Sequence, residues 1–302
     1  MPAKKTSPWM PTHLDKAYWR EAGYTKSDLL DYYEKIAPFL LPYLKDRPVV
    51  MKRFPEGIDH ESFFQKNVTN KHLPSFVRLA TIPAKTIDKD VHYIIANNKE
   101  TLLYMANFGA IELHPWASRV RCLTEPDFMI FDLDPGEQTT FDMAIEAAHA
   151  VKNVLDTCGI QSYPKTSGKR GLHVYVPVGG KYTYENVRDF ALRVADVVVE
   201  RHLTLASLAK HPADRKDKIF IDYLRNSFGQ TAAAAYCPRA TPTATISTPL
   251  EWSEVWVGLS PEQFTIRTIF KRLEKKGDIW RPVLGKGADL QKAVQKVSLL
   301  QR

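Results

Sequence analysis

The order of apolar and amphipathic segments between residues 128 and 224 constrains the fold of this chain more than any other feature of its sequence. Short apolar or alternating runs predict four strands, and helical spacing of apolar residues predicts two helices. The expected strands are 128–134, 160–164, 172–178 and 218–224, and the expected helices are 140–157 and 184–201. This βαββαβ order is typical of ferredoxin-like and RNA-recognition folds, in which the first strand lies between the third and the fourth.

The first 120 residues predict a second, less regular α/β part. Thr25 and Asp28 are spaced as a capping box, so we expect a helix to about residue 44, bent or split at Pro38. Other expected elements are an ordered loop over residues 1–20, strands at 49–54, 91–96 and 111–114, and helices at 60–67 and about 102–108. After residue 230 we expect a polar loop, a helix at 261–274 and a basic tail from residue 275.

Composition limits the class of protein. The 302 residues are 44% hydrophobic and 25% charged, which excludes chain-wide disorder, a collagen-like fibre and a disulfide scaffold. Lys and Arg outnumber Asp and Glu by 42 to 34, and the net charge of +8 is compatible with nucleic acid without requiring it. Ten Lys or Arg but only five Asp or Glu fall within residues 165–216, so part of the excess is concentrated there.

The cysteines and the apolar runs bear on the compartment. Cys122, Cys158 and Cys237 form no C-x-x-C pair and no zinc-binding spacing, so we expect plain buried thiols in a reducing compartment. No segment approaches the ~18 consecutive apolar residues of a membrane helix, and no apolar signal segment follows the first lysines. We therefore expect a cytoplasmic protein with no membrane partner.

Three carboxylates suggest a metal site. Asp132 and Asp134 lie at i and i+2 on the first expected strand and therefore share a face. Two such carboxylates repel each other unless a cation neutralises them, and Mg²⁺ or Mn²⁺ is the usual solution. Asp222 lies on the expected neighbouring strand, and three converging acids are typical of two-metal nucleotidyl transfer. The plainer alternative is a pair of solvated acids before a Pro-Gly turn.

Residues 166–173, Thr-Ser-Gly-Lys-Arg-Gly-Leu-His, join two expected strands. The two glycines permit positive φ and let backbone N–H groups face an anion, while Ser167, Lys169 and Arg170 add a hydroxyl group and two cations. A basic hairpin turn would have the same composition, so the loop alone is a weak signal. Together with the three acids, it favours a site for a nucleoside triphosphate.

Three ordered motifs carry a family resemblance. FDLDPGE at 131–137, TSGKRGLHVYVPV at 166–178 and RKDKIFIDYLRN at 215–226 resemble the motifs of the archaeo-eukaryotic primase superfamily. They are most similar to the polymerase domain of the bacterial end-joining ligase D, and the similarity extends from His13 to Arg239. The resemblance implies an α/β primase-polymerase fold, with a βαββαβ catalytic module packed on an N-terminal α/β module.

The resemblance also implies a single domain over residues 1–302. Its expected parts are an N-terminal module at 1–120 that contacts DNA ends, a catalytic module at 121–260, and a helix with a basic tail at 261–302. Because these residues include no ligase or nuclease module, a stand-alone polymerase or an excised domain is expected.

Site residues carry over from the family motifs position by position. Asp132, Asp134 and Asp222 match its catalytic metal ligands. The positions that match nucleotide-binding residues are Lys52, Phe63, His114, Ser167, Arg170, His173, Arg215 and Arg239. The positions that match DNA-binding residues are His13, Lys16, Lys26 and Phe64, and the two lysines match a pocket for the 5′-phosphate of a downstream strand. Without the resemblance, the lysines are ordinary solvated charges, and Phe63 and Phe64 are one core and one exposed residue.

The resemblance implies an enzyme, a template-dependent nucleotidyltransferase that extends 3′ ends and fills short gaps in non-homologous end joining. The family prefers ribonucleotides over deoxyribonucleotides and uses two Mn²⁺ or Mg²⁺ ions. The implied partners are gapped or broken DNA with a 5′-phosphate, NTPs or dNTPs, a Ku-like protein and a separate DNA ligase, in a prokaryotic nucleoid.

Two positions depart from the family pattern, and two other functions stay open. His13 stands where Asn is frequent, and Arg225 stands where a Gln near the nucleotide is common. A primase that starts strands without a primer is the nearest alternative. A non-catalytic module that binds nucleic acid on an RNA-recognition-like sheet is less favoured, because that sheet should be basic and aromatic. A D-x-D glycosyltransferase would leave Asp222 and the basic loop unexplained.

Overall fold

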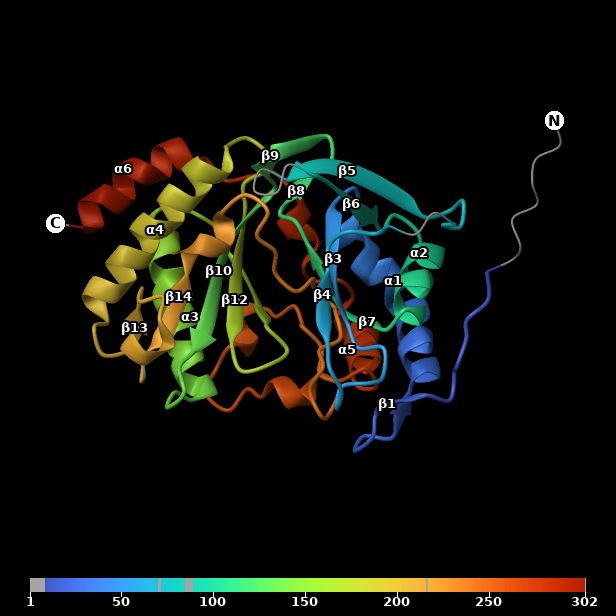
Figure 1. Cartoon of the computed structure of the whole chain (residues 1–302). Helices are drawn as coiled ribbons and strands as arrows, with labels where there is room; N and C mark the ends of the chain where they lie inside the picture. Colours follow the sequence, from blue (N-terminus) through green and yellow to red (C-terminus); the bar gives the residue numbers. More distant parts are fainter. Residues whose placement is uncertain (1–8, 70–71, 85–88, 216, 302) are drawn as a thin grey trace.

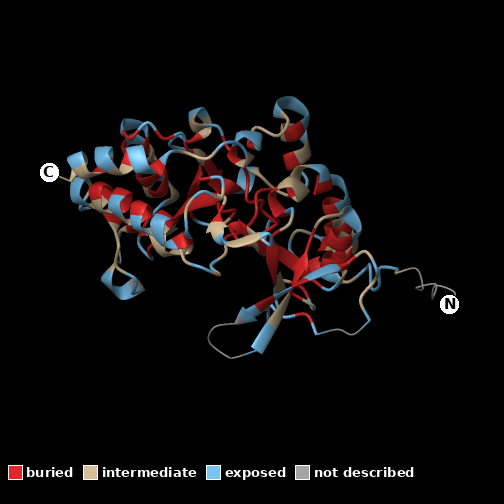
Figure 2. Ribbon diagram, turned by 90° about the horizontal axis from the view of Figure 1, so that it is seen from above, coloured by how far each residue is buried: buried red, intermediate tan, exposed pale blue. Residues whose placement is uncertain are grey.

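Two five-stranded sheets organise the computed structural model, which describes residues 9–69, 72–84, 89–215 and 217–301 (Figure 1). One sheet has the order β4-β3-β6-β5, with β7 also paired to β3, and the other has the order β11-β12-β10-β14-β13. Helices α1 and α2 lie at one side of the molecule, while α3, α4 and α6 lie at the other (Figure 1). Buried residues concentrate on the strands and on the inward faces of these helices (Figure 2).

The bounds of these elements follow. The strands are β1 (Ala17–Trp19), β2 (Tyr24–Thr25), β3 (Pro48–Arg53), β4 (Phe63–Gln65), β5 (Arg78–Ala84), β6 (Lys89–Ile95), β7 (Ala110–Pro115), β8 (Ser118–Arg119), β9 (Cys122–Pro126), β10 (Phe128–Pro135), β11 (Tyr163–Thr166), β12 (Leu172–Pro177), β13 (Ala206–Ser207) and β14 (Ile219–Asp222). The α-helices are α1 (Lys26–Leu44), α2 (Lys99–Asn107), α3 (Phe141–Thr157), α4 (Tyr184–Arg201), α5 (Ile269–Lys276) and α6 (Leu290–Leu300). The 3₁₀ turns are η1 (Pro212–Asp214), η2 (Tyr223–Asn226), η3 (Trp252–Glu254), η4 (Pro261–Gln263) and η5 (Arg281–Leu284).

The βαββαβ order predicted from the sequence is confirmed. Strand β10 is central and pairs antiparallel with β12 on one side and β14 on the other, as the split topology requires. The short strand β13 adds a parallel partner to β14 that the sequence pattern did not indicate. Met129, Phe131 and Leu133 are buried in one core cluster with the inward faces of α3 and α4, so the even-numbered carboxylates of β10 lie on the opposite face.

Helix α1 is continuous. Thr25 caps it with the expected capping box, in which Asp28 accepts from the Thr25 backbone N–H. Of the bend or split expected at Pro38, the split is wrong, because α1 runs through both Pro38 and Pro42. The buried face of α1 belongs to the core that it shares with both sheets, and this burial offsets the hydrogen bonds that the two prolines remove.

Three sequence predictions outside the βαββαβ unit are wrong. The helix expected at 60–67 is the edge strand β4, which pairs with β3, and adjacent aromatic residues are typical of strands. The polar loop expected after residue 230 is largely buried from Ala232 to Cys237, where small side chains pack against β7. The helix expected at 261–274 begins only at Ile269, because Thr265 forms a β-bridge with Thr245.

The two ends of the chain also differ from their predictions. The loop expected over residues 1–20 contains strand β1, and its first eight residues lie outside the described ones. The basic tail from residue 275 contains α6, whose Leu290, Ala293 and Val297 are buried in the same core as α3 and α4. Within the residues that the structure describes, no helix combines the length and the apolar character that a membrane span needs.

Candidate active site

A row of charged residues crosses the second sheet. Lys165 of β11 is paired with His173 of β12, and His173 is paired with Asp132 of β10. Asp132 is in turn paired with Asp222 of β14. Because directly opposed residues of neighbouring strands point to one face, the four side chains lie on the same side of the sheet. Asp134, two residues after Asp132 on β10, shares that face.

Asp132, Asp134 and Asp222 therefore come together, and one oxygen of each lies within 4.8 Å of the others. Arg225, on the η2 turn that follows β14, places Nη2 3.0 Å from Oδ2 of Asp132 and 3.0 Å from Oδ2 of Asp222. His173 donates from Nε2 to Oδ1 of Asp132 at 3.0 Å. The cluster thus has an acidic centre with one guanidinium group and one imidazole group attached to it.

Burial and the neighbouring charges give the three carboxyl groups different pKa values. Burial, with repulsion from Asp132, raises the pKa of Asp134 to about 7. Burial also raises the pKa of Asp222. Burial acts in the same direction on Asp132, but His173 and Arg225 together hold its pKa well below the usual range. At neutral pH, Asp132 is a carboxylate, whereas Asp134 is close to half protonated.

A buried lysine stands behind His173. Burial and the neighbouring charge of Lys165 lower the pKa of His173 to about 4, so the imidazole that donates to Asp132 is neutral. Lys165 is fully buried and donates to Oγ of Ser247 at 2.5 Å, and its own pKa is well below the usual range because of that burial. His173 Nδ1 is buried and has no hydrogen-bond partner among the described residues.

The acidic cluster fits a divalent metal ion. Its ligand atoms are carboxylate oxygens, which hard cations such as Mg²⁺ and Mn²⁺ prefer. Oδ1 of Asp222 is buried without a hydrogen-bond partner in the described part of the chain, and a cation would satisfy it. Burial and repulsion from Asp132 raise the pKa of Asp134, and a bound cation would counter the repulsion.

The loop between β11 and β12 folds around Ser167. Its Oγ accepts from the backbone N–H groups of Lys169 and Gly171, both at 3.1 Å. Gly168 has a φ of +74°, and a Cβ there would lie 2.9 Å from the backbone carbonyl carbon of Ile246, so the turn requires glycine. The loop is thereby held against the segment that contains Ile246.

A buried glutamate contacts three basic residues, Lys169, His114 and Arg239, which we call the basic cluster. Oε1 of Glu112, on β7, lies 3.1 Å from Nζ of Lys169, and its Oε2 lies 3.1 Å from Nε2 of His114 and 3.3 Å from Nη2 of Arg239. Burial opposes ionisation of Glu112, but these neighbours hold its pKa far below the usual range. The side chain of Glu112 is only 1% exposed, so it contacts these groups from within the protein.

Two other arginines differ in how they are held. Arg170 donates from Nη2 to the backbone oxygens of Gly136, at 2.9 Å, and Thr139, at 3.3 Å, so it secures the turn after β10. Arg215 lies over the Phe220 ring, 4.4 Å from its centroid, and its Nε and Nη1 are buried with no partner among the described residues. These unpaired donors of Arg215 are available to an anion.

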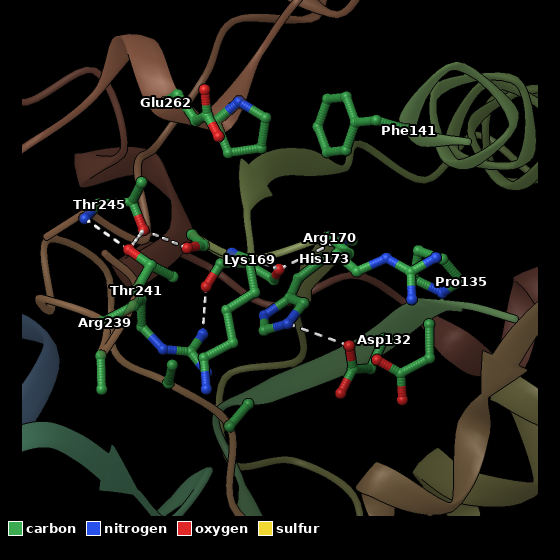
Figure 3. A pocket seen from close by; sticks show the side chains of 18 of the residues that line it. Asp132, Pro135, Phe141, Lys169, Arg170, His173, Arg239, Thr241, Thr245 and Glu262 are labelled. Carbon is green, nitrogen blue, oxygen red and sulfur yellow. Dashed lines mark hydrogen bonds and ion pairs between the residues drawn. The ribbon is translucent and has the colours of Figure 1, made fainter. Parts of the chain in front are cut away.

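Asp132 and Asp134 of the acidic cluster line one cavity of about 950 Å³ together with Lys169, His114 and Arg239. Figure 3 shows His173 lying between Asp132 at one side of the view and Arg239 at the other. The predicted site residues that line the cavity are His114, Asp132, Asp134, Ser167, Arg170, His173, Arg215 and Arg239. Asp222 lines a different cavity, of about 410 Å³, and is joined to the large one by its closeness to Asp132 and Asp134 and by its ion pair with Arg225.

Lys52, Phe63 and Phe64 lie outside the lining of that cavity. The Phe64 ring packs edge-on against His114, and Nζ of Lys52 lies 5.4 Å from the centroid of the same ring. Phe63 points to the other face of β4, where Arg53 lies over its ring. Both rings are about half exposed, so each is available for stacking.

A second cavity of about 390 Å³ is lined by His13, Lys16 and Lys26, together with Arg53. Nζ of Lys26 donates to the backbone oxygen of Thr12 at 2.5 Å. Nζ of Lys16 donates at 2.7 Å to a carboxylate oxygen of the exposed Glu56. Burial and the neighbouring Lys16 lower the pKa of Lys26.

Comparison with known proteins decides the family. The family model "LigD, primase-polymerase domain" matches residues 25–280, which is most of the chain. The chain belongs to this family. Members are nucleotidyltransferase-type enzyme domains, and the resemblance noted from the three motifs is confirmed.

Two curated relatives of this LigD-family chain are full-length end-joining proteins. The chain is 34% identical to the bifunctional non-homologous end joining protein LigD of Bacillus subtilis, over 267 residues. It is 31% identical to the multifunctional LigD of Mycolicibacterium smegmatis, over 276 residues. These alignments cover 88% and 90% of this chain but 42% and 35% of the relatives, so the chain spans less than half of their length.

A solved structure confirms the LigD polymerase fold. The polymerase domain of Mycobacterium tuberculosis ligase D, determined in complex with DNA, matches with a TM-score of 0.85 at 27% sequence identity. The match covers 93% of this chain and 99% of that domain. The α/β fold class predicted from the sequence is therefore confirmed.

Sequence reasoning missed two buried residues of this LigD-family site. Glu112 was overlooked, although a glutamate and a histidine at i and i+2 in an apolar strand indicate a polar face there. Lys165 is part of a basic segment in the sequence, and nothing marks it as buried, since Pro164, Lys165 and Thr166 are all buried in β11 and show no alternation. The partnership of Arg225 with the two acids was also missed, because only the η2 turn after Asp222 brings its guanidinium group back over them.

Proposed function

We propose that this chain is a template-dependent polymerase that extends 3′ ends and fills short gaps during non-homologous end joining, with ribonucleotides as its preferred substrates. One observation carries the proposal: Asp132 and Asp134 of the three-acid cluster line the same cavity as the basic residues Lys169 and Arg239. An incoming nucleoside triphosphate needs both, because metal ions and cations must neutralise its phosphates while the 3′ oxygen approaches the first of them.

Asp132, Asp134 and Asp222 would hold two divalent ions, Mn²⁺ or Mg²⁺. When bound, these ions would supply the positive charge that favours a deprotonated 3′ oxygen and a pyrophosphate leaving group. His173 supports this arrangement by donating to Oδ1 of Asp132, which fixes the orientation of the carboxylate. Burial keeps the imidazole neutral, so it donates its one N–H proton to Asp132.

The triphosphate would lie against the basic cluster. Ser167 and Arg239 face the cavity, and His114 joins them at its wall. Lys169 adds a further cation, and Glu112 holds the cluster in position from behind. The unpaired Nε and Nη1 of Arg215 are suited to a phosphate oxygen. Arg170 contributes by holding the loop and the β10 turn in register.

The aromatic residues of β4 would stack on bases. Because Phe64 contacts His114, a lining residue of the large cavity, we assign Phe64 to the nucleotide side, together with Lys52. Phe63 lies against Arg53, a residue that lines the second cavity, and we assign Phe63 to the DNA. The contacts thus favour the reverse of the distribution that the family resemblance implied for the two rings.

The second cavity would bind the 5′-phosphate of a downstream strand. Lys16 and Lys26 point cationic groups into it, and His13 completes its rim in place of the more frequent Asn. In this structure, Nζ of Lys16 donates to Glu56 and Nζ of Lys26 donates to the backbone oxygen of Thr12. We propose that this polymerase module acts with a Ku-like protein and a DNA ligase, at the nucleoid in the cytoplasm.

A primer-extension assay tests this function. The protein is given a gapped duplex with a 5′-phosphate and either NTPs or dNTPs, each with Mn²⁺ or Mg²⁺. We expect templated addition that is faster with NTPs and fills the gap. Products on an unprimed template would favour a primase instead, and no incorporation under any of these conditions would contradict the proposal.

A further inference from the structure

Arg225 occupies the place where a metal ion would contact two of the three acids. Its Nη2 lies 3.0 Å from Oδ2 of both Asp132 and Asp222, so a single N–H₂ group bridges two strands of the sheet. The other carboxylate oxygen of each acid, Oδ1, is not the one paired with Arg225. Oδ1 of Asp132 accepts from His173, and Oδ1 of Asp222 is buried with no partner in the described chain.

The guanidinium group is held mainly by these acids. Its Nη1 donates only weakly to the backbone oxygen of Thr231, at 3.4 Å, and its Nε is buried without a partner among the described residues. The side chain is 26% exposed and lines the large cavity, so space for another rotamer exists on the solvent side. The nearby carboxylates raise the pKa of Arg225 despite its burial, so it is a permanent cation.

The backbone beneath Arg225 is fixed. The next residue, Asn226, is buried and accepts from the N–H of Ile130 at 2.8 Å while donating to its backbone oxygen at 2.7 Å. This pair of hydrogen bonds fastens the η2 turn to β10. Any movement that separates Arg225 from the acids is therefore a change of its side chain, with η2 and the sheet left in place.

We propose that Arg225 is a displaceable internal counter-cation that competes with the metal ion for Asp132 and Asp222. This inference rests on the proposed metal site. A divalent ion binds carboxylate oxygens at about 2 Å, and a guanidinium group on the same oxygens would stand within about 4 Å of it, with like charge. A metal ion that binds these Oδ2 oxygens must release Arg225 from at least one of the two acids.

Two consequences follow for the metal-free and metal-bound protein. Without metal, Arg225 stabilises a cluster of three carboxyl groups that would otherwise repel one another. With metal, the released guanidinium group remains inside the nucleotide cavity, which it already lines. Arg225 therefore lowers the affinity for the metal ion in the absence of nucleotide and supplies a cation to the cavity when the ion arrives.

Direct Mn²⁺ titration without nucleotide or DNA tests the proposal, with free Mn²⁺ followed by electron paramagnetic resonance. Arg225→Gln removes the charge, Arg225→Lys keeps it, and Arg188→Gln is a control at an exposed ion pair of α4. We expect roughly tenfold tighter Mn²⁺ binding by Arg225→Gln, since one charged hydrogen-bond partner of the acids is gone. Arg225→Lys and Arg188→Gln should remain close to the parent protein.

Thermal unfolding gives the second readout. Metal-free Arg225→Gln should unfold at a lower temperature than the parent protein, and saturating Mn²⁺ should raise its unfolding temperature by more. A purely structural role for Arg225 would lower the unfolding temperature without tightening Mn²⁺ binding. If the metal-free variant does not fold, it is prepared with Mn²⁺, and loss of the ion to a chelator should be slower than from the parent protein.

The outcomes separate the two proposals. Equal or weaker Mn²⁺ binding by a folded Arg225→Gln, or equal or faster loss of the ion to the chelator, overturns the role of Arg225 and leaves the metal site standing. No Mn²⁺ binding by the parent protein overturns both the metal site and the role of Arg225.

Discussion

At the scale of single residues, each charged cluster of the site contains one side chain of opposite sign. Arg225 lies among the carboxylates, and Glu112 lies among the cations. Such buried groups carry a desolvation cost that only close partners offset. The ion pairs of these two residues could not be predicted from the sequence, because neither an alternating pattern nor a motif indicates which charged side chains are in contact.

The raised pKa of Asp134 predicts a proton linkage. A carboxyl group whose pKa is about 7 in the folded metal-free protein holds a proton that a metal ion must displace. Calorimetric Mn²⁺ titrations in buffers of different ionisation enthalpy should therefore show release of about one proton near pH 6 and almost none near pH 8. Asp134→Asn should abolish most of this difference.

Through Asp134, the free energy of unfolding depends on pH with the opposite sign to that of a salt-bridged acid. Between the ordinary pKa of an aspartate and about 7, the folded metal-free protein binds more protons than the unfolded chain. Its free energy of unfolding should therefore fall as the pH rises through this range. If proton release on Mn²⁺ binding does not depend on pH, the raised pKa does not belong to Asp134.

Glu112 gives a second prediction at this scale. Glu112→Gln leaves Lys169 and Arg239 without their buried counter-anion, so the free energy of unfolding should fall by about 3 kcal/mol. The KM for the nucleotide should rise as well, because the cations lose their fixed positions. Urea unfolding and steady-state kinetics measure the two effects.

The exposed pair of Glu34 and Lys99 provides the matched control. Glu34→Gln should change the free energy of unfolding by no more than about 0.5 kcal/mol. If Glu112→Gln behaves in the same way, Glu112 is not an organising residue of the basic cluster.

At the scale of elements, long periodic segments were predictable and short ones were not. Helices α3 and α4 and strand β10 follow from their apolar spacing, and the neighbours of β10 follow from the split topology. The register that puts Asp132 opposite Asp222 does not follow, since it depends on where the loops end. Strand β4 is not predictable from the sequence, because three residues are too few to show a strand or helix period and because β4 is defined by its pairing with β3.

Strand β4 carries its own prediction. Its two aromatic residues point to opposite faces, Phe64 toward His114 and Phe63 toward Arg53. Phe64→Ala should mainly raise the KM for the nucleotide, while Phe63→Ala should mainly weaken DNA binding, each by roughly tenfold since base stacking contributes about 1–3 kcal/mol.

Steady-state kinetics and DNA titration of both variants distinguish the two faces. Leu203→Ala, at an exposed apolar residue far from β4 in sequence, serves as the control and should change neither quantity. Equal effects of Phe63→Ala and Phe64→Ala on both quantities would show that the division between the faces is wrong.

At the scale of the whole molecule, two cavities are linked by one strand pair. The larger cavity contains both charged clusters, and the smaller one contains Lys16 and Lys26. Strands β3 and β4 connect them, since Phe64 contacts the wall of one cavity while Arg53 lines the other. A gap in DNA would present a 3′ end and a 5′-phosphate to these two places.

This arrangement predicts a dependence on the 5′-phosphate. Removing it from a gapped duplex should weaken binding by roughly tenfold, and Lys16→Ala with Lys26→Ala should erase the difference. The double variant Lys35→Ala with Lys45→Ala removes the same charge from exposed positions outside the cavity and should preserve it. Fluorescence anisotropy with the two duplexes measures the effect, and equal affinity of the parent protein for both would refute the pocket.

We propose that three carboxylates from two neighbouring strands act together as the catalytic centre. Single-nucleotide incorporation on a gapped duplex tests it most directly, with Asp222→Asn compared against Asp217→Asn, a variant of an exposed acid just before β14. Asp222→Asn should fold and bind DNA but incorporate roughly a hundredfold more slowly or worse, while Asp217→Asn should stay near the parent rate. Incorporation by Asp222→Asn at the parent rate would contradict it.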